Sequence, residues 1–283
     1  MAFQWQTFRT RALTAIVFVA VMAIGLLWSR WSFFVLFSIV HFGGWLEYQK
    51  LVSLFNPDYK SINAAHKYGV MLGGWCAMLF FTNSYLQIGG VHLHMIGLWV
   101  GIAFLLLFPV AQLVGNKAFY LKNIGYSLAG LVYISLPLAL MVNLRNRWGT
   151  DLDLTIPLLI IFTIWINDTM AYVVGSFIGK TPFSPISPKK TWEGTIGGAI
   201  LAVVVMSLIA YFTGRLSVLN TAIISAIAAV SGTYGDLFES KLKRMAGVKD
   251  SGSFMPGHGG FLDRFDSLLF ASTCVWMYAV WIK

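Results

Sequence analysis

Charged residues are scarce in this chain. Only 11% of its 283 residues are Asp, Glu, Lys or Arg, whereas 58% are hydrophobic. Soluble domains carry about 25% charged residues, so the composition excludes an ordinary soluble domain and indicates a protein that crosses a membrane several times. Cysteine is also rare. Cys76 and Cys274 both lie inside apolar runs, and their spacing offers neither a disulfide framework nor a zinc site.

The sequence also has no low-complexity segment, no convincing internal repeat and no polar stretch that would make a separate soluble domain. It consists mainly of apolar runs of about the 17–25 residues that a membrane-spanning helix needs. We expect nine spans, at residues 11–28, 31–48, 68–86, 95–114, 124–143, 155–179, 194–213, 217–236 and 265–282. The predicted fold class is therefore all-α, a polytopic transmembrane helical bundle.

The first span follows Arg9 and Arg11 and resembles a signal sequence, but no small-residue cleavage site follows it. We therefore expect it to stay as an anchor. The net charge of +9 predicts no nucleic-acid partner, because membrane proteins gather positive charge in their cytoplasmic loops. If the segments outside the spans are numbered from zero at the N-terminus, the even ones hold 15 of the 20 Lys and Arg. This bias predicts a cytoplasmic N-terminus and a C-terminus outside.

Charge is concentrated in residues 235–266. This stretch holds five of the eleven acidic residues (Asp236, Glu239, Asp250, Asp263 and Asp266) and five basic ones (Lys241, Lys243, Arg244, Lys249 and Arg264). If the eighth span continues as a helix, Asp236, Glu239, Ser240 and Lys243 form one polar stripe, because they follow helical spacing. Gly247 then breaks the helix, and the Gly-rich residues 256–260 form a sharp loop.

The carboxylates and bases of this stretch suit phosphate chemistry. Asp263 and Asp266 share a helix face at the start of the ninth span. Asp236 and Asp263, from two helices, suit a hard divalent cation, since Mg²⁺ is bound by one or two carboxylates plus substrate phosphates. The basic residues would then bind the phosphates. This is the composition expected for phosphoryl or nucleotidyl transfer.

Asp168 lies inside the sixth predicted span, where an acidic residue is costly and suggests function. Asp168, Tyr172 and Gly175 follow helical spacing, so one polar, open face could point into the bundle. Gly175 and Gly179 fit close helix packing. A buried hydrogen bond to a neighbouring helix is the alternative role for Asp168.

Residues 184–198 form a second polar motif, SPISPKKTWEGTIGG. Its prolines fix a turn before Lys189 and Lys190, and a Gly-rich helix start follows. Backbone N–H groups at a helix N-terminus suit phosphate, and adjacent lysines add point charges. No Walker A motif is present, and a basic cytoplasmic loop is the alternative. Glu47, at the inner end of the second span, is interpreted as an interfacial charge.

The charged stretch resembles the signature of the CTP:phosphatidate cytidylyltransferases, the CDP-diacylglycerol synthases. The resemblance covers 27 residues and rests on Ser240, Lys243, Arg244, Lys249, Asp250, His258, Gly259, Gly260, Asp263, Arg264 and Asp266. The segment around Asp168 and residues 187–194 resemble other shared blocks of that family. The N-terminal half is similar only in general character.

The resemblance implies that CTP and phosphatidate react to give CDP-diacylglycerol and pyrophosphate, with Mg²⁺ and with K⁺ as a second cation. It implies Asp236 and Asp263 as metal ligands. It also implies catalytic roles for Lys243, Asp250 and Asp266, and substrate-binding or supporting roles for Asp168, Ser187, Lys189, Lys190, Thr191, Glu193, Arg244, Lys249, His258 and Arg264. Lys189 and Lys190 would bind CTP phosphates, whereas the basic residues of the charged stretch would bind phosphatidate or pyrophosphate.

We further expect residues 1–150 to form a scaffold with lipid and dimer contacts, and residues 151–283 to carry the site. The expected partners are CTP, phosphatidate, membrane lipids and a second copy of the chain. The expected location is the cytoplasmic membrane, with the site facing the cytoplasm.

Other functions stay open at this point. Asp168 and spans interrupted by Gly or Pro would fit an ion-coupled transporter, although the charge gathers at span ends. The Asp-Gly-x-x-Ala-Arg pattern of the CDP-alcohol phosphotransferases is absent. A cytidylyltransferase for another lipid phosphate, such as an archaeal ether lipid, would keep much of the same site.

Overall fold

The computed structural model describes residues 5–115, 121–254 and 259–282. Regular structure in these residues is helical apart from two short hairpins. The chain divides into two compact units. Unit 1 comprises residues 1–135 and 245–265, and unit 2 comprises residues 136–244 and 266–283.

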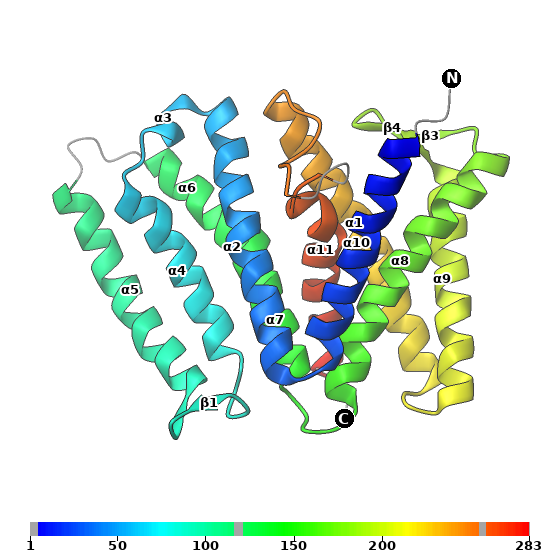
Figure 1. Ribbon diagram of the computed structural model, residues 1–283, viewed down its shortest axis with the longest axis horizontal. Helices are drawn as coiled ribbons and strands as arrows, with labels where there is room; N and C mark the ends of the chain where they lie inside the picture. Colours follow the sequence, from blue (N-terminus) through cyan, green and yellow to red (C-terminus); the bar gives the residue numbers. More distant parts are fainter. Residues whose placement is uncertain (1–4, 116–120, 255–258, 283) are drawn as a thin grey trace. The chain divides into compact units, whose positions relative to one another are not determined.

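Unit 1 begins with two long helices that pack against each other, α1 (Trp5–Leu27) and α2 (Arg30–Phe55). The short α3 (Pro57–Lys60) leads to a second packed pair, α4 (Ala64–Phe80) and α5 (Leu93–Gly115), joined by the hairpin of β1 (Gln87–Ile88) and β2 (Val91–His92). Figure 1 shows α4 and α5 side by side. Helix α6 (Leu121–Gly130) continues into a π-helix, η1 (Leu131–Ser135).

The sequence explains the tight connection between α1 and α2. Ser29 and Ser32 form a capping box, in which each side chain accepts a hydrogen bond from the other residue's backbone N–H, at 3.0 and 2.9 Å. This arrangement pairs N–H groups that a helix start otherwise leaves without a partner. Only two residues therefore separate the end of the first helix from the start of the second.

Helix α2 is anchored in unit 1 along its length. Its aromatic residues Phe33, Phe37 and Trp45 are fully buried. The indole of Trp45 donates a hydrogen bond to Ser135 Oγ at 2.8 Å, and His41 Nε2 lies 3.0 Å from the same oxygen. Because α2 is fixed in this way, a side chain near its end can serve as a rigid support.

Unit 2 contains α7 (Leu136–Arg145), α8 (Leu152–Ile178), α9 (Trp192–Thr213) and α10 (Val218–Met245). A hairpin of β3 (Pro182–Ser184) and β4 (Ser187–Thr191) connects α8 to α9. Helix α11 (Leu262–Ala279) starts in unit 1 and runs on in unit 2.

Helices α8 and α9 lie side by side (Figure 1) because glycines let their backbones approach. A Cβ added at Gly198 would lie 2.7 Å from the carbonyl oxygen of Asn167 and 2.8 Å from Ala171 Cβ. A Cβ at Gly194 would lie 2.6 Å from the carbonyl oxygen of Ala171. Gly175 and Gly179 both face Thr191, so the small-residue packing predicted for this segment is present.

The expected spans all fall on helices, with α6, η1 and α7 together making one of them. Several boundaries differ: α1 begins at Trp5, α2 continues to Phe55, α4 ends at Phe80, before the β1–β2 hairpin, and α10 continues to Met245. Within the described residues, five helices are long and apolar enough to cross a membrane, namely residues 93–110, 122–145, 152–178, 192–213 and 218–245. The chain is thus a multi-pass membrane protein, whereas the count of nine spans and the orientation stay predictions.

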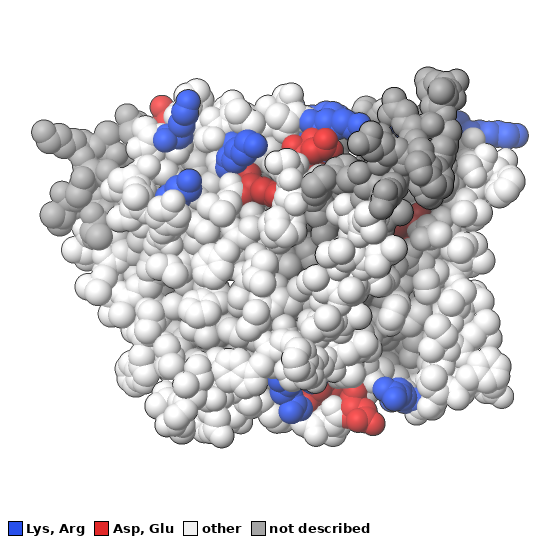
Figure 2. Space-filling view, viewed as in Figure 1, with Lys and Arg blue, Asp and Glu red and all other residues white. Residues whose placement is uncertain are grey.

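The surface agrees with this assignment. Figure 2 shows charged side chains near helix ends and a wide uncharged surface between them. Many large apolar side chains of the helices are exposed, for example Leu105, Tyr211 and Phe212, at 71–80%. Such apolar exposure is expected where helices face lipid.

Candidate active site

Unit 2 contains a polar cavity of about 430 Å³. Its walls come from α8, β4, α9 and α10, and it is lined by Asn167, Asp168, Ala171, Tyr172, Gly175, Ser176, Ser187, Lys189, Lys190, Thr191, Thr195, Thr233 and Asp236. Six of the residues predicted to bind or react lie in this set: Asp168, Ser187, Lys189, Lys190, Thr191 and Asp236. Segments that are far apart in sequence thus meet at one site.

Helix α8 forms one wall. Asp168, Tyr172 and Gly175 all line the cavity, as their helical spacing predicts. Asn167 beside them is 4% exposed, and its side-chain amide donates a 3.3 Å hydrogen bond to Asp168 Oδ1. This contact is between neighbouring residues of α8, so it leaves the carboxylate facing the cavity.

The β3–β4 hairpin forms the opposite wall. The turn predicted at the prolines lies at residues 185–186, and the strand that follows it, β4, carries Lys189 and Lys190 to the cavity. Thr191 is the N-cap of α9, because its hydroxyl accepts a 3.2 Å hydrogen bond from Gly194 N–H. Glu193 does not line the cavity; its carboxylate accepts hydrogen bonds from the N–H groups of Lys180 and Thr181, at 3.2 Å. It fixes the chain where the hairpin begins.

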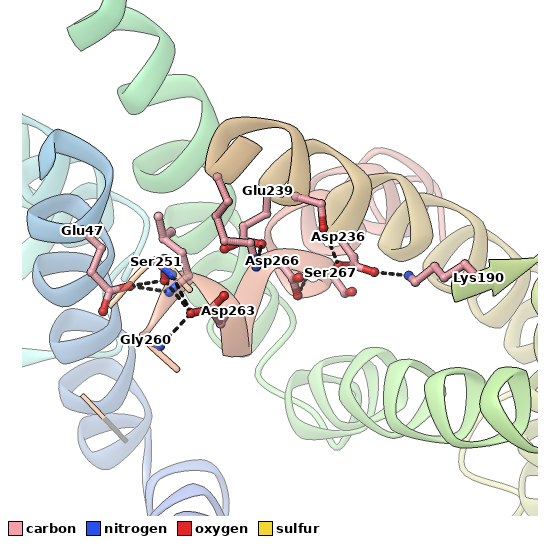
Figure 3. Close-up of polar contacts among 12 residues, drawn as sticks. Glu47, Lys190, Asp236, Glu239, Ser251, Gly260, Asp263, Asp266 and Ser267 are labelled. Carbon is pink, nitrogen blue, oxygen red and sulfur yellow. Dashed lines mark hydrogen bonds and ion pairs between the residues drawn. The ribbon is translucent and has the colours of Figure 1, made fainter. Parts of the chain in front are cut away.

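Helix α10 brings Asp236 to the cavity. It continues beyond Asp236, so the predicted polar stripe exists. The carboxylate of Asp236 forms an ion pair with Lys190 (Figure 3). Glu239 is fully buried and pairs with Lys243 one turn later, at 2.5 Å. The stripe therefore joins the lysine strand through Asp236 and carries its own internal ion pair.

Asp266, on α11, completes an acidic cluster with Asp236 and Glu239 (Figure 3). One carboxylate oxygen from each residue lies within 4.8 Å of the other two. Like charges placed so closely repel each other unless a cation or a proton compensates them. Hard carboxylate oxygens from two helices are the donor set that Mg²⁺ prefers, so these residues fit a divalent cation.

A second polar centre lies in unit 1, at the start of α11. Asp263 Oδ2 accepts hydrogen bonds from Gly260 N–H at 2.7 Å and from Ser251 N–H at 2.9 Å (Figure 3). Glu47 Oε1 accepts one from Phe261 N–H at 2.9 Å. These contacts fix the two ends of the loop between α10 and α11.

The other residues of the predicted signature are placed as follows. Arg244, Lys249, Asp250 and Arg264 are exposed, whereas His258 lies outside the described residues. Asp236 clusters with Asp266 in unit 2, and Asp263 belongs to unit 1. The pairing of Asp236 with Asp263 around a metal ion stays a prediction.

Sequence reasoning missed two acidic residues. Glu239 was assigned to the polar stripe but not to the metal, although its spacing from Asp236 was the available signal. The interpretation of Glu47 as an interfacial charge is wrong, because the residue is 9% exposed and bonded to a loop more than 200 positions away. No local sequence pattern predicts a contact between residues so far apart in the chain.

The sequence profile of the Cytidylyltransferase family matches residues 9–282. The chain belongs to this family. It is 37% identical over 199 residues to the phosphatidate cytidylyltransferase of Bacillus subtilis, which covers 69% of this chain and 71% of that protein. Membership identifies the chain as a nucleotidyltransferase, which removes the transporter alternative.

Two further relatives carry the same name. The phosphatidate cytidylyltransferase of Thermotoga maritima is 38% identical over 158 residues, covering 53% of this chain and 57% of that protein. That of Staphylococcus haemolyticus is 46% identical over 109 residues, covering 38% and 42%. These two matches span about half the length of the relatives or less.

Proposed function

We propose that this nucleotidyltransferase transfers the cytidylyl group of CTP to phosphatidate, giving CDP-diacylglycerol and pyrophosphate. The observation that carries the proposal is the cavity of unit 2, where Lys189 and Lys190 lie with Asp168 and Asp236. Lysine side chains that can bind a polyphosphate and carboxylates that can bind a cation thus line the same polar cavity. The curated relatives are named for this reaction.

The cavity suits the nucleotide in size and charge. Its volume of about 430 Å³ lies within the 300–1,000 Å³ range of small-molecule sites. Lys189 is exposed and Lys190 retains 31% exposure of its side chain, so both ammonium groups can reach a triphosphate that enters. Lysine acts on phosphate as a strong point charge. These residues would therefore bind and orient CTP.

Asp236, Glu239 and Asp266 would hold Mg²⁺. When bound, the cation neutralises charge on the phosphates during transfer. Asp236 already faces Lys190, so nucleotide phosphates and Asp236 would compete for that ammonium group. A second cation, K⁺, is a prediction from the family resemblance, and Asp168 is its candidate ligand.

The reaction needs positioning more than proton transfer. A phosphatidate oxygen forms a bond to the α-phosphorus of CTP, and the bond from that phosphorus to the bridging oxygen of the β-phosphate breaks. Pyrophosphate leaves with the electron pair. Because the attacking phosphate is already anionic at neutral pH, no strong general base is needed. Lys189 and Lys190 would hold the α-phosphorus in place and stabilise the departing charge.

Unit 1 offers features that suit the lipid. An apolar cavity of about 150 Å³ lies between α1, α2 and the start of α11. Phe18, Val21, Val40 and Phe261 line it, together with the exposed Arg264. An engineered cavity of about this volume accepts a benzene-sized group, so this one would hold a short stretch of acyl chain. Arg264 would attract the lipid phosphate.

The membrane location follows the same proposal. The positive-inside bias supports a cytoplasmic N-terminus, with the cavity of unit 2 open to cytoplasmic CTP. We propose the cytoplasmic membrane as its location and a homodimer as its assembly. Accessibility of single introduced cysteines to a membrane-impermeant reagent tests the orientation.

The reaction is tested with CTP labelled at its α-phosphate and purified protein in detergent. Phosphatidate and an archaeal ether-lipid phosphate are offered as separate acceptors, each with and without Mg²⁺. We expect label in a chloroform-soluble product with phosphatidate and Mg²⁺ only. Preferential labelling of the ether lipid would redirect the substrate assignment, and label in neither lipid would refute the proposed function.

A further inference from the structure

Glu47 is a buried acid on α2 that belongs to none of the predicted motifs. The residue is 9% exposed, and its carboxylate accepts three hydrogen bonds from the segment before α11 and from the first residue of that helix. Phe261 N–H donates to Oε1 at 2.9 Å, Leu262 N–H to Oε2 at 2.9 Å, and Ser251 O–H to Oε2 at 2.7 Å (Figure 3). Buried carboxylates need such partners, because an unpaired buried charge is very costly.

Two glycines shape the contact. A Cβ added at Gly252 or at Gly260 would collide with the Glu47 carboxylate. At Gly252 and at Gly260, the backbone of the loop therefore approaches the Glu47 carboxylate with no side chain between them. Glycine at these positions is required by close approach rather than by the backbone angles, since neither has a positive φ.

The bonds from Phe261 and Leu262 have a second consequence. Leu262 is the first residue of α11, and the N–H groups at a helix start have no partner within the helix. Glu47 satisfies two of them from another helix, as an N-cap residue does, and its negative charge suits the positive end of the helix dipole. It thereby fixes where α11 begins and how that helix start is oriented.

Two of the residues that this contact orients, Phe261 and Arg264, belong to the predicted lipid site. Asp263 and Arg264 follow Leu262 directly, and Asp263 Oδ2 lies 2.9 Å from the Ser251 Oγ that donates to Glu47. Phe261 stacks on Phe254, with ring centroids 3.9 Å apart, and both rings line the apolar cavity. A shift of the loop would therefore move the guanidinium group of Arg264 together with the phenylalanine rings that line the cavity.

We propose that Glu47 is a positioning residue for the lipid substrate: it holds Ser251 and residues 261–262 so that Arg264 and Phe261 face the lipid. This inference rests on the proposed function, in which unit 1 binds phosphatidate. Glu47 itself touches neither substrate. The N-terminal helices then contribute directly to the site, in addition to supporting it.

The test compares Glu47→Gln with wild type in two measurements. Gln has the same size but only one acceptor oxygen, so it turns an NH₂ group toward a backbone or hydroxyl donor. We expect the KM for phosphatidate to rise about tenfold or more, as for the loss of a charge-assisted hydrogen bond, with the KM for CTP unchanged. We also expect faster backbone hydrogen exchange in a peptide covering residues 249–262.

Gln49→Leu is the matched control. Gln49 lies two residues away on α2, is 4% exposed, and donates a part-buried 2.9 Å hydrogen bond to the carbonyl of Lys67. The Gln49→Leu variant loses this part-buried hydrogen bond without touching the loop, so the ratio of the two KM values and the loop exchange should stay at wild-type values. If Glu47→Gln does not fold, Ser251→Ala removes one of the three bonds and should give a smaller change of the same kind.

The outcomes separate the two proposals. Wild-type KM values and unchanged loop exchange in both Glu47→Gln and Ser251→Ala would refute the positioning role. So would loss of activity that tracks thermal stability equally in Glu47→Gln and Gln49→Leu. If the wild-type protein labels no phosphatidate, the proposed function fails, whereas the exchange measurement still tests the attachment of the loop to Glu47.

Discussion

Lys190 on β4 forms an ion pair with Asp236 on α10 across the cavity of unit 2. Both side chains stay partly exposed, at 31% and 26%. Each group has a predicted ligand of its own: nucleotide phosphates for the lysine and a cation for the aspartate. The pair therefore keeps two oppositely charged groups in place, and substrate and cation binding would separate them.

Replacing Lys190 should weaken CTP binding selectively. We expect Lys190→Ala to raise the KM for CTP about 10- to 100-fold, because a hydrogen bond to a charged group contributes roughly 1.5–3 kcal/mol. The KM for phosphatidate should change little. Lys180→Ala is the control, since Lys180 is exposed near the same hairpin but does not line the cavity. Equal increases in both KM values would remove Lys190 from the nucleotide site.

The acidic residues can be separated by their magnesium dependence. Asp266→Asn removes a charge from the cluster with Asp236 and Glu239 and should raise the Mg²⁺ concentration for half-maximal activity about tenfold or more. Asp263→Asn instead disturbs the bonds to Ser251 and Gly260, so we expect a loss of about 1–3 kcal/mol in stability with unchanged Mg²⁺ dependence.

The reverse pattern would support the metal pair predicted from sequence, Asp236 with Asp263. Magnesium titration of the labelled-CTP assay and thermal melting in detergent provide the two readouts. Asp58→Asn serves as a control, because Asp58 is an exposed acid on α3, outside both polar centres.

Close packing of α8 on α9 should be sensitive to a single methyl group. Gly198→Ala would force its Cβ against the backbone of Asn167 and Ala171, and we expect a loss of about 1–3 kcal/mol of stability, as for other overpacked sites. CTP affinity should fall as well, because Asn167 and Ala171 line the cavity. Gly125→Ala, where a Cβ meets nothing within 4 Å, should melt at or above the wild-type temperature. Equal melting of both variants would contradict the close approach.

Local sequence patterns could predict the parts of the site that one element carries. Asp168, Tyr172 and Gly175 share a face because a helix repeats every 3.6 residues, and the cavity lies on that face. The polar stripe of α10 follows from the same period. The turn before Lys189 and Lys190 was predicted from its prolines and is present at residues 185–186, whereas the two short strands beside it were not predicted.

Contacts between distant segments could not be predicted in this way. Glu47 and Leu262 are 215 positions apart, and the acid alone, near a span end, is typical of an interfacial charge. The choice between Asp263 and Asp266 was similarly open, since both lie on one face of the same helix. Tertiary packing decides which neighbours each carboxylate meets, and helical periodicity does not contain that information.

The apolar cavity of unit 1 predicts a dependence on acyl-chain length. Val21 on α1 lines this cavity and is 51% exposed, whereas Val19 on the same helix is 53% exposed and does not line it. Val21→Trp should fill part of the cavity and lower kcat/KM for long-chain phosphatidate relative to a short-chain one, while Val19→Trp should leave that ratio unchanged. Because lipid tails are as apolar as the cavity wall, the effect should come from lost room rather than from lost hydrophobic burial. We therefore expect a change of about three- to tenfold, typical of one or two methylene groups in an apolar pocket. Competition between the two lipids in mixed micelles measures the ratio directly, and an identical ratio in both variants would exclude the acyl chain from this cavity.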